Sequence, residues 1–168
     1  MEFEVSLNNI SFSINNNKYL KPKTFEELTE ELDNWIEKYF HFNGLTYRMD
    51  TFFAYDYVDH CIIINWLDNL KETHKKFRQF LYEYGAETAA INFTNDSLAF
   101  LHELAHCLTT GWFDDIEMII YNFGKESVNN AFDYWEIPDE FEANMVVVDF
   151  INTNPEAIKE LDNIFMGW

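Results

Sequence analysis

The stretch AFLHELAHCL, residues 99–108, contains two histidines, His102 and His106, that are four positions apart. Residues with this spacing lie on the same face of an α-helix, so both imidazoles can point to one place in space. The surrounding leucines and alanines predict that this helix is partly buried. Burial of two histidines without partners would cost free energy, and a metal ion bound between them would remove that cost.

Together with Glu103, the two histidines form the pattern H-E-x-x-H. In metallopeptidases with this pattern the histidines bind Zn²⁺, and the glutamate acts as a general base on a water molecule at the metal. We therefore predict Zn²⁺ as the cofactor, with His102 and His106 as ligands and Glu103 as the catalytic base. The alternative interpretation is a chance match on a buried helix.

A catalytic zinc site needs a third protein ligand and one open position. No histidine follows His106, so carboxylates in the C-terminal half are the candidates. The stretch IPDEFEANMVVVDFI, residues 137–151, predicts a helix with Glu140 and Asn144 on one face. Glu140 is the predicted third ligand, and Asn144 is predicted to hydrogen-bond a ligand histidine. Alternatively, the acidic residues here only favour the N-terminus of a helix electrostatically.

The other histidines and the two cysteines are not predicted to bind the metal. His41, His60 and His74 are expected to be surface residues or to pack on strands, and Cys107 faces about 100° away from its neighbour His106. Cys61 and Cys107 do not form a disulfide framework, and no N-terminal secretory pattern is visible. These features favour a cytoplasmic protein with free thiols.

The chain is expected to be a single α+β domain over residues 1–168, because it has no linker, repeat or low-complexity tail. Thr24 and Glu27 form a capping-box pattern at the start of one helix, and Gly44 is expected to end it. Residues 86–96 are expected to be a loop. Asn95, Asp96 or Ser97 is expected to cap the helix that follows. The predicted helices span residues 24–40, 69–85, 95–110, 114–123, 127–135, 139–152 and 155–166.

Strands are expected at residues 3–7, 11–14, 45–49, 51–58 and 60–66. We expect them to form a small, mostly antiparallel sheet in the N-terminal part, packed on a helical bundle that carries the metal helix. An edge strand near CIIIN, residues 61–65, is expected to hold a peptide in extended form.

The net charge of −19 argues against direct binding to nucleic acid, because phosphate would be repelled. No apolar run reaches the roughly 20 residues that a membrane helix needs. The simplest reading of the charge is a soluble, self-repelling surface. The alternative is a nucleic-acid mimic, or a protein that docks on a basic partner.

The pair HELAH and EFEAN, residues 102–106 and 140–144, resembles the gluzincin metallopeptidases, and most of all the small ImmA/IrrE-type bacterial and phage peptidases. The resemblance covers about residues 60–152. It implies a zincin-like fold in which His102, His106 and Glu140 bind zinc and Glu103 is the base. Thermolysin-like enzymes use a histidine or tyrosine as a second donor to the substrate, and here Tyr134, or else Tyr121, is expected in that role.

The predicted function is therefore a zinc-dependent peptidase that acts on a peptide or protein substrate, with a preference for basic ones. The alternative is an acidic binding or decoy protein that inhibits a basic partner and has a structural or vestigial metal site. A third reading is a zincin fold that has lost its activity and serves as a scaffold. The frequent Asn, Ile, Lys and Phe residues are typical of a genome rich in A and T, and the size is typical of a phage or mobile-element gene.

Overall fold

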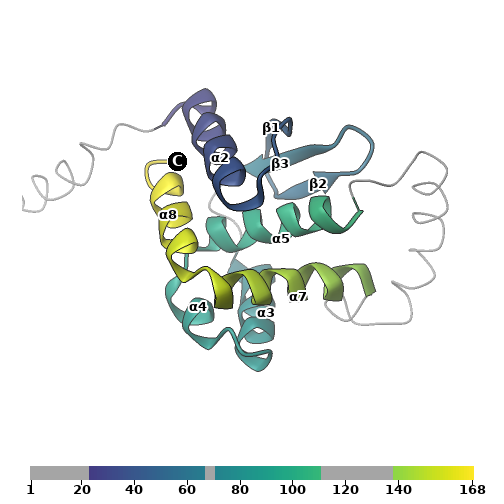
Figure 1. Cartoon of the computed structure of the whole chain (residues 1–168), viewed down its shortest axis with the longest axis vertical. Helices are drawn as coiled ribbons and strands as arrows, with labels where there is room; N and C mark the ends of the chain where they lie inside the picture. The colour runs from purple at the N-terminus through teal and green to yellow at the C-terminus, as the bar shows by residue number, and fades with distance from the viewer. Residues whose placement is uncertain (1–22, 67–70, 111–137) are drawn as a thin grey trace, which may run out of the picture.

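The computed structural model describes residues 23–66, 71–110 and 138–168 and shows an α+β fold (Figure 1). The strands predicted at residues 3–7 and 11–14 and the helices predicted at 114–123 and 127–135 lie outside these residues. The elements follow one another as α2 (Phe25–Phe40), β1 (Thr46–Asp50), β2 (Ala54–Asp56), β3 (Cys61–Asn65), α3 (Lys71–Glu83), α4 (Glu87–Asn92), α5 (Asn95–Thr110), α7 (Pro138–Thr153) and α8 (Pro155–Phe165).

Helix α2 begins at the predicted capping box. The Thr24 hydroxyl accepts the backbone N–H of Glu27, and the Glu27 carboxylate accepts the backbone N–H of Thr24. The predicted end at Gly44 is wrong, because His41 caps the helix in the left-handed conformation with φ of 57°. Gly44 follows in the connection to β1. The Trp35 indole donates to the Ala157 carbonyl over 2.8 Å and ties α2 to α8.

The sheet is mixed, and the expectation of a mostly antiparallel sheet is wrong. β3 lies in the centre, paired in parallel with β1 and antiparallel with β2. All five residues of β3 are buried, and a strand buried on both faces takes partners on both edges. CIIIN is therefore the central strand and not an edge strand. The edges of the described sheet are β1 and β2.

The remaining helices confirm most of the predicted boundaries, with two corrections. The expected loop at residues 86–96 contains a short helix, α4, which starts without a side-chain cap. The residue before α5 is Thr94, whose hydroxyl accepts the backbone N–H of Ser97 over 3.2 Å. Thr94 therefore caps α5 in place of the three residues that we expected. Pro155 occupies the first turn of α8, as predicted.

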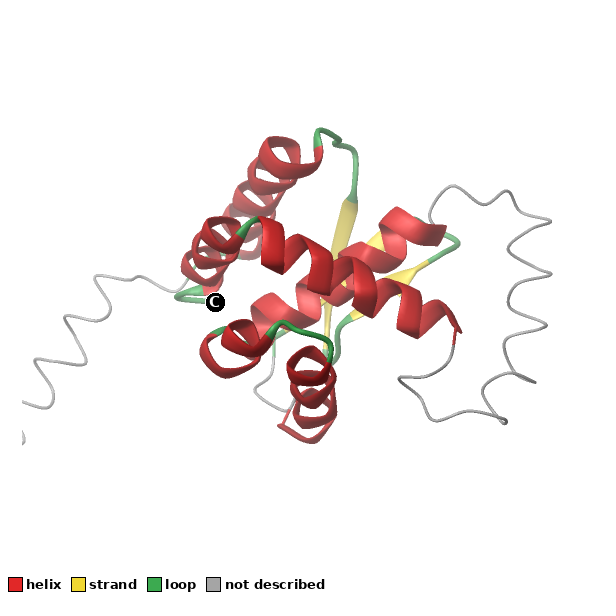
Figure 2. Cartoon of the chain, turned by 60° about the horizontal axis from the view of Figure 1, so that its bottom comes forward, coloured by secondary structure: helices red, strands yellow, loops and turns green. Residues whose placement is uncertain are grey.

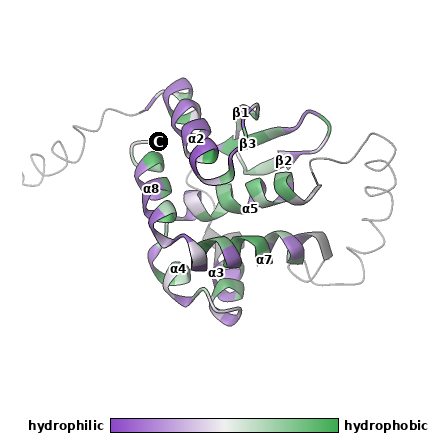
Figure 3. Ribbon diagram, in the orientation of Figure 1, coloured by the Kyte–Doolittle hydropathy of each residue, from purple (hydrophilic) through white to green (hydrophobic). Residues whose placement is uncertain are grey.

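The core lies between the sheet and the helices, with α5 in the middle. This helix packs against β2, β3, α7 and α8, and the strands lie behind α5 and α7 in Figure 2. Figure 3 shows that β3 and α5 are largely hydrophobic, whereas α2 is hydrophilic along its outer side. None of the described helices is long and apolar enough to span a membrane. The fold thus places the helix with the two histidines at its centre.

Candidate metal centre

The first turn of α5 is fixed by a contact with the C-terminal helix. The Asp162 carboxylate of α8 accepts the backbone N–H of Thr94 over 3.2 Å and the Thr94 hydroxyl over 2.9 Å. The same hydroxyl caps the helix at Ser97. One carboxylate of α8 therefore orients the cap of the helix that carries His102 and His106.

A second contact holds the connection between α4 and α5. The Arg78 guanidinium of α3 donates to the carbonyls of Ala90 and Phe93 and to the side-chain oxygen of Asn95. Burial lowers the pKa of Arg78, and the charge of Asp162 acts in the opposite direction. Because a guanidinium presents its donors in a fixed planar fork, these bonds hold the turn before α5 in one geometry.

Helix α7 presents two polar side chains to α5. Glu140 and Asn144 are four residues apart and both are buried, with exposed fractions of 3% and 0%. Their neighbours on the buried side of α7 are apolar: Ala143, Val147, Val148 and Ile151. A carboxylate and an amide on such a surface require polar partners, since burial without them is costly.

The partners are the two histidines of α5. The Glu140 Oε2 atom lies 2.8 Å from His102 Nε2 and 3.1 Å from His106 Nε2. The two Nε2 atoms are 3.2 Å apart. The structure thus brings together all three residues predicted as ligands, from two helices, with Glu140 34 positions after His106 in the chain.

Asn144 fixes the orientation of His102. Its Oδ1 atom lies 2.8 Å from His102 Nδ1, so the ring donates from Nδ1 to the amide oxygen. In the neutral ring the lone pair then resides on Nε2, which is the atom that faces Glu140 and His106. The predicted role of Asn144 as the partner of a ligand histidine agrees with this geometry.

The electrostatics of the cluster favour a cation between these groups. Burial raises the pKa of Glu140, but hydrogen bonds from His102 and His106 hold it well below its usual range. Burial lowers the pKa of His102. Its hydrogen bond to Glu140 and the charges of Glu103 and Glu140 raise this pKa by a larger amount, so the net pKa lies above the ordinary value. The carboxylate therefore stays ionised and attracts positive charge to the Nε2 atoms.

The geometry of the three ligand atoms suits a metal ion. Two atoms bound tetrahedrally to one ion at about 2.0–2.1 Å are about 3.3 Å apart. The observed separations of 2.8, 3.1 and 3.2 Å are only slightly shorter, so small side-chain movements would admit the ion. Among the described residues, His102, His106 and Glu140 are the one group of three such side chains placed to hold a metal.

In the described part of the chain, two aromatic rings contact the histidine pair. The Phe77 ring lies 5.4 Å from the His102 ring, and the Tyr57 ring lies 6.3 Å from the His106 ring, both edge to face. Glu103 is half-buried on α5, and its charge contributes to the raised pKa of His102. The predicted base thus acts electrostatically on the cluster.

The other histidines and the cysteines that the structure describes do not belong to the group formed by His102, His106 and Glu140. His41 is an exposed helix cap, and the Nδ1 atom of exposed His60 lies 2.8 Å from the Tyr55 hydroxyl. Cys107 is half-buried, and burial raises the pKa of its thiol while a hydrogen bond with Tyr55 opposes the shift. Tyr121, Tyr134 and the side chain of His74 lie outside the described part of the chain.

Tyr57, Phe77 and Arg78 also contact or support the site, and were not predicted from the sequence. Arg78 is half-buried and donates hydrogen bonds to backbone carbonyls. The apolar positions Phe77, Phe80 and Leu81 around it could have shown that this part of α3 is buried. Tyr57 lies beyond a strand end, and no local pattern marks its approach to His106.

Comparison of the chain with protein-family models, with curated proteins and with solved structures gave no match.

Proposed function

We propose that this protein is a zinc-dependent peptidase with a zincin-like fold of the gluzincin type. The observation that carries the proposal is the convergence of His102, His106 and Glu140 on one point, with Asn144 behind His102. Glu103 adjoins the first ligand. Two histidines and a glutamate are the protein ligands in one class of catalytic zinc sites and leave a position open for substrate or water.

Zinc is the favoured ion because of the donor set. Imidazole nitrogens suit Zn²⁺ and other late transition metals, whereas Mg²⁺ and Ca²⁺ prefer sites built from oxygen atoms. The site offers two nitrogens and one oxygen at 3–4% exposure. This combination favours a tightly held transition metal over an exchangeable alkaline-earth ion.

The proposed chemistry divides the work between the ion and Glu103. When bound, Zn²⁺ would lower the pKa of a water molecule and polarise the scissile carbonyl. The Glu103 carboxylate takes the proton from the attacking water and then gives it to the leaving amine. Glu140 and Asn144 hold the two imidazoles in a fixed geometry, which spares reorganisation during the reaction.

The peptide would bind along β2 in this proposal. β2 is an edge strand of the described sheet, and the residue after it, Tyr57, contacts His106. An extended peptide that adds to this edge would carry its backbone towards the metal ligands. The net charge of −19 favours basic substrates.

Metal analysis tests the site directly. We expect about one zinc per chain in the native protein and a loss of zinc in His102→Ala, because that variant removes a ligand. His41→Asn is the matched control, since it removes an exposed histidine and asparagine tolerates the left-handed conformation there. Equal zinc in all three proteins would contradict the proposal.

Hydrolysis by Glu103→Gln tests the mechanism. We expect this variant to retain zinc and to lose cleavage of a mixture of basic synthetic peptides, measured by mass spectrometry. Glu142→Gln, at an exposed position of α7, should leave both zinc and cleavage unchanged. Cleavage by the Glu103→Gln protein at the native rate would exclude Glu103 as the base.

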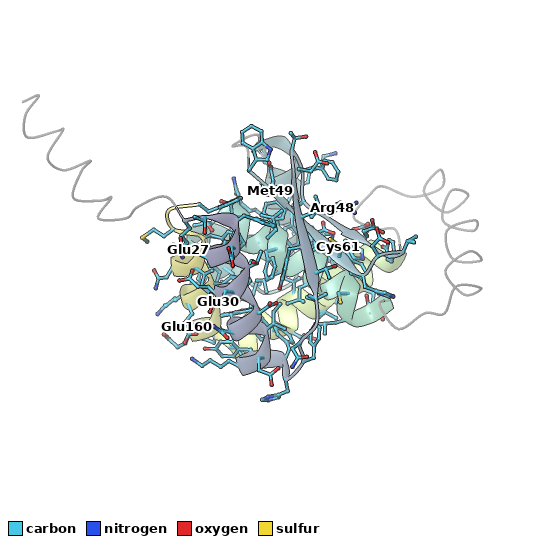
Figure 4. The ribbon with its side chains drawn as sticks, turned by 90° about the horizontal axis from the view of Figure 1, so that it is seen from above. Glu27, Glu30, Arg48, Met49, Cys61 and Glu160 are labelled. Carbon is cyan, nitrogen blue, oxygen red and sulfur yellow. The ribbon has the colours of Figure 1, made fainter. Side chains whose placement is uncertain are left out.

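An acidic binding protein is the second candidate, and the charged outer side of α2 favours it. Glu27 and Glu30 are exposed on this helix and lie on its outward side (Figure 4). This function predicts salt-sensitive binding to a basic probe such as poly-lysine that survives Glu103→Gln. The peptidase function predicts instead that cleavage of a basic peptide is lost in Glu103→Gln.

A further inference from the structure

We propose that the outer edge of β1 and the side of α2 next to it form a docking surface for an extended, basic segment of a partner protein. This docking surface contains none of the proposed metal ligands, and the inference goes beyond the proposed peptidase function. It is carried by an apolar hollow at the end of β1, by the open edge of that strand and by the charge of α2.

The hollow has a volume of about 580 Å³, and we call it the tryptophan hollow. It is lined by Lys23, Met49, Trp66, Gly167 and Trp168. Met49 and Trp66 are large apolar residues, yet they are 50% and 58% exposed. The Trp168 indole is held in place, because it donates to the Asn65 carbonyl over 3.0 Å and its ring contacts Phe25. Large apolar side chains that gather on a surface are typical of an interaction site.

Lys23 does not make the tryptophan hollow a site for an anion. Its ammonium group pairs with the Glu31 carboxylate and donates to the Ile164 carbonyl, so its charge is already compensated. The two indoles and Met49 then dominate the walls. Such walls suit an aromatic or aliphatic side chain of a bound segment.

Strand β1 has an open edge in the described sheet. The strand order is β1-β3-β2, so β3 occupies one side of β1 and no described strand occupies the other. An extended segment can add to such an edge through backbone hydrogen bonds. Met49 lies on the same face of the sheet as buried Ile64, its partner in β3. Every second side chain of an added strand would lie on this face, next to the tryptophan hollow.

Helix α2 adds negative charge beside this edge. The Tyr47 hydroxyl of β1 donates to the Asp33 carboxylate of α2 over 2.7 Å, and the two elements lie next to each other (Figure 1, Figure 4). Glu26, Glu30 and Glu37 are exposed and stand at helical spacing from Asp33, so they share its side of the helix. A row of carboxylates attracts basic side chains and repels acidic ones. A second copy of this chain, with its net charge of −19, would be repelled.

Fluorescence anisotropy of a labelled synthetic peptide, with the full chain, tests the docking surface. The probe is a short peptide in which lysine and phenylalanine residues alternate with threonine. EDTA is present, so that metal-dependent cleavage does not interfere. We expect Trp66→Ala to bind the probe about 10- to 100-fold more weakly, as for the loss of an aromatic anchor. Ile91→Ala, at a 68% exposed position of α4, is the matched control and should bind like the native protein.

Two further measurements test the strand pairing and the charge. Methylation of alternate backbone nitrogens of the probe removes the donors for strand pairing and should abolish binding, which simple attraction to an acidic protein would not require. Glu30→Gln should weaken binding about two- to fivefold at low salt, as for a surface ion pair. Glu142→Gln removes an exposed charge of α7 and should leave binding unchanged.

The outcomes separate the possible occupants. Native affinity in Trp66→Ala, or equal binding of the methylated probe, would overturn the proposal. Displacement of the probe by a synthetic peptide of residues 1–22, or a dimer in sedimentation that Trp66→Ala dissociates, would assign the docking surface to this chain itself and also overturn it. His102→Ala should bind the probe like the native protein, so a failure of the metal site and a failure of the docking surface are distinguishable.

Discussion

Helices α2 and α7 have the same length of 16 residues but use their buried faces differently. The buried residues of α2 are Leu28, Leu32, Trp35 and Ile36, and its charges are exposed. The buried face of α7 includes Glu140 and Asn144 among alanine and valine residues. α2 therefore serves packing, whereas α7 places an ionised group in the core.

The difference shows where the fold buries polar groups at a cost in free energy. A buried carboxylate loses its hydration, and its partners restore only part of the stabilisation. The partly exposed Glu160, which pairs with Lys38 and Tyr39 at 2.8 Å, keeps more of its hydration. A polar group on the apolar side of a helix is thus a better indicator of a site than the many carboxylates on the surface.

The largest expected effect separates two glutamates of α7. Glu140→Ala removes a proposed ligand and should weaken zinc binding by more than the 10- to 100-fold typical for a partner of a ligand. Glu142→Ala changes an exposed carboxylate two residues away and should leave zinc binding unchanged. Titration with a competing chelator measures the zinc affinity of both variants. Equal affinities would show that the buried and the exposed face of α7 do not differ in metal binding.

Asn144→Ala should have the next largest effect. It removes the acceptor for His102 Nδ1 without removing a ligand, and we expect zinc affinity to fall by about 10- to 100-fold. Asn144→Asp retains the acceptor oxygen and should bind zinc more tightly than the alanine variant. Zinc affinity that is the same in Asn144→Ala and the native protein would show that the amide does not orient the ligand.

The metal-free protein should show a stability maximum in mildly acidic solution. The lowered pKa of Glu140 contributes stability above its unfolded value of about 4.5, which is lost as the pH falls. The raised pKa of His102 contributes stability below its unfolded value of about 6.5, which is lost as the pH rises through the folded value. Urea unfolding between pH 3 and 9, with roughly one-unit steps, measures this profile.

Replacement of Glu140 and His102 together tests the origin of that profile. The double variant Glu140→Gln, His102→Gln should lose the fall in stability at low pH and the fall in stability at higher pH that arise from this pair. Lys159→Met removes the exposed ion pair with Glu156 and should leave the profile in place. A profile that persists in the double variant would assign the pH dependence to other groups.

The smallest expected effect lies in α2. Thr24→Ala removes the side-chain cap and should lower the free energy of unfolding by about 1 kcal/mol, without a change in zinc affinity. Thr24→Ser keeps the hydroxyl and should be close to the native protein. A loss of zinc in Thr24→Ala would mean that the packing helix and the metal helices are coupled more strongly than their separate faces indicate.

The features predicted from sequence were those with local causes. The α2 cap depends on Thr24 and Glu27, and the convergence of His102 and His106 depends only on helical periodicity. The pairing of Glu140 with them required the additional argument that a buried site lacks a third histidine. The first two inferences needed no knowledge of how distant segments pack, whereas the third assumed that α7 lies against α5.

The features that were predicted wrongly depend on tertiary contacts. The parallel pairing of β1 with β3 depends on the path of the chain through β2, which no local pattern encodes. The continuous apolar run in β3 did signal a central strand, and we interpreted it as an edge. The helix α4 has only six residues and no side-chain cap, so its sequence resembles a loop.

The contact of Asp162 with Thr94 has a mechanical consequence. Because the last helix holds the cap of α5, a pulling force applied to α8 would be transmitted to the first turn of the helix that carries the histidines. Arg78 of α3 holds the same turn by hydrogen bonds, so the force would be shared between two sets of contacts. The rigidity of the helix that carries His102 and His106 would then depend on side chains of α8 and α3 that lie outside the histidine and glutamate group.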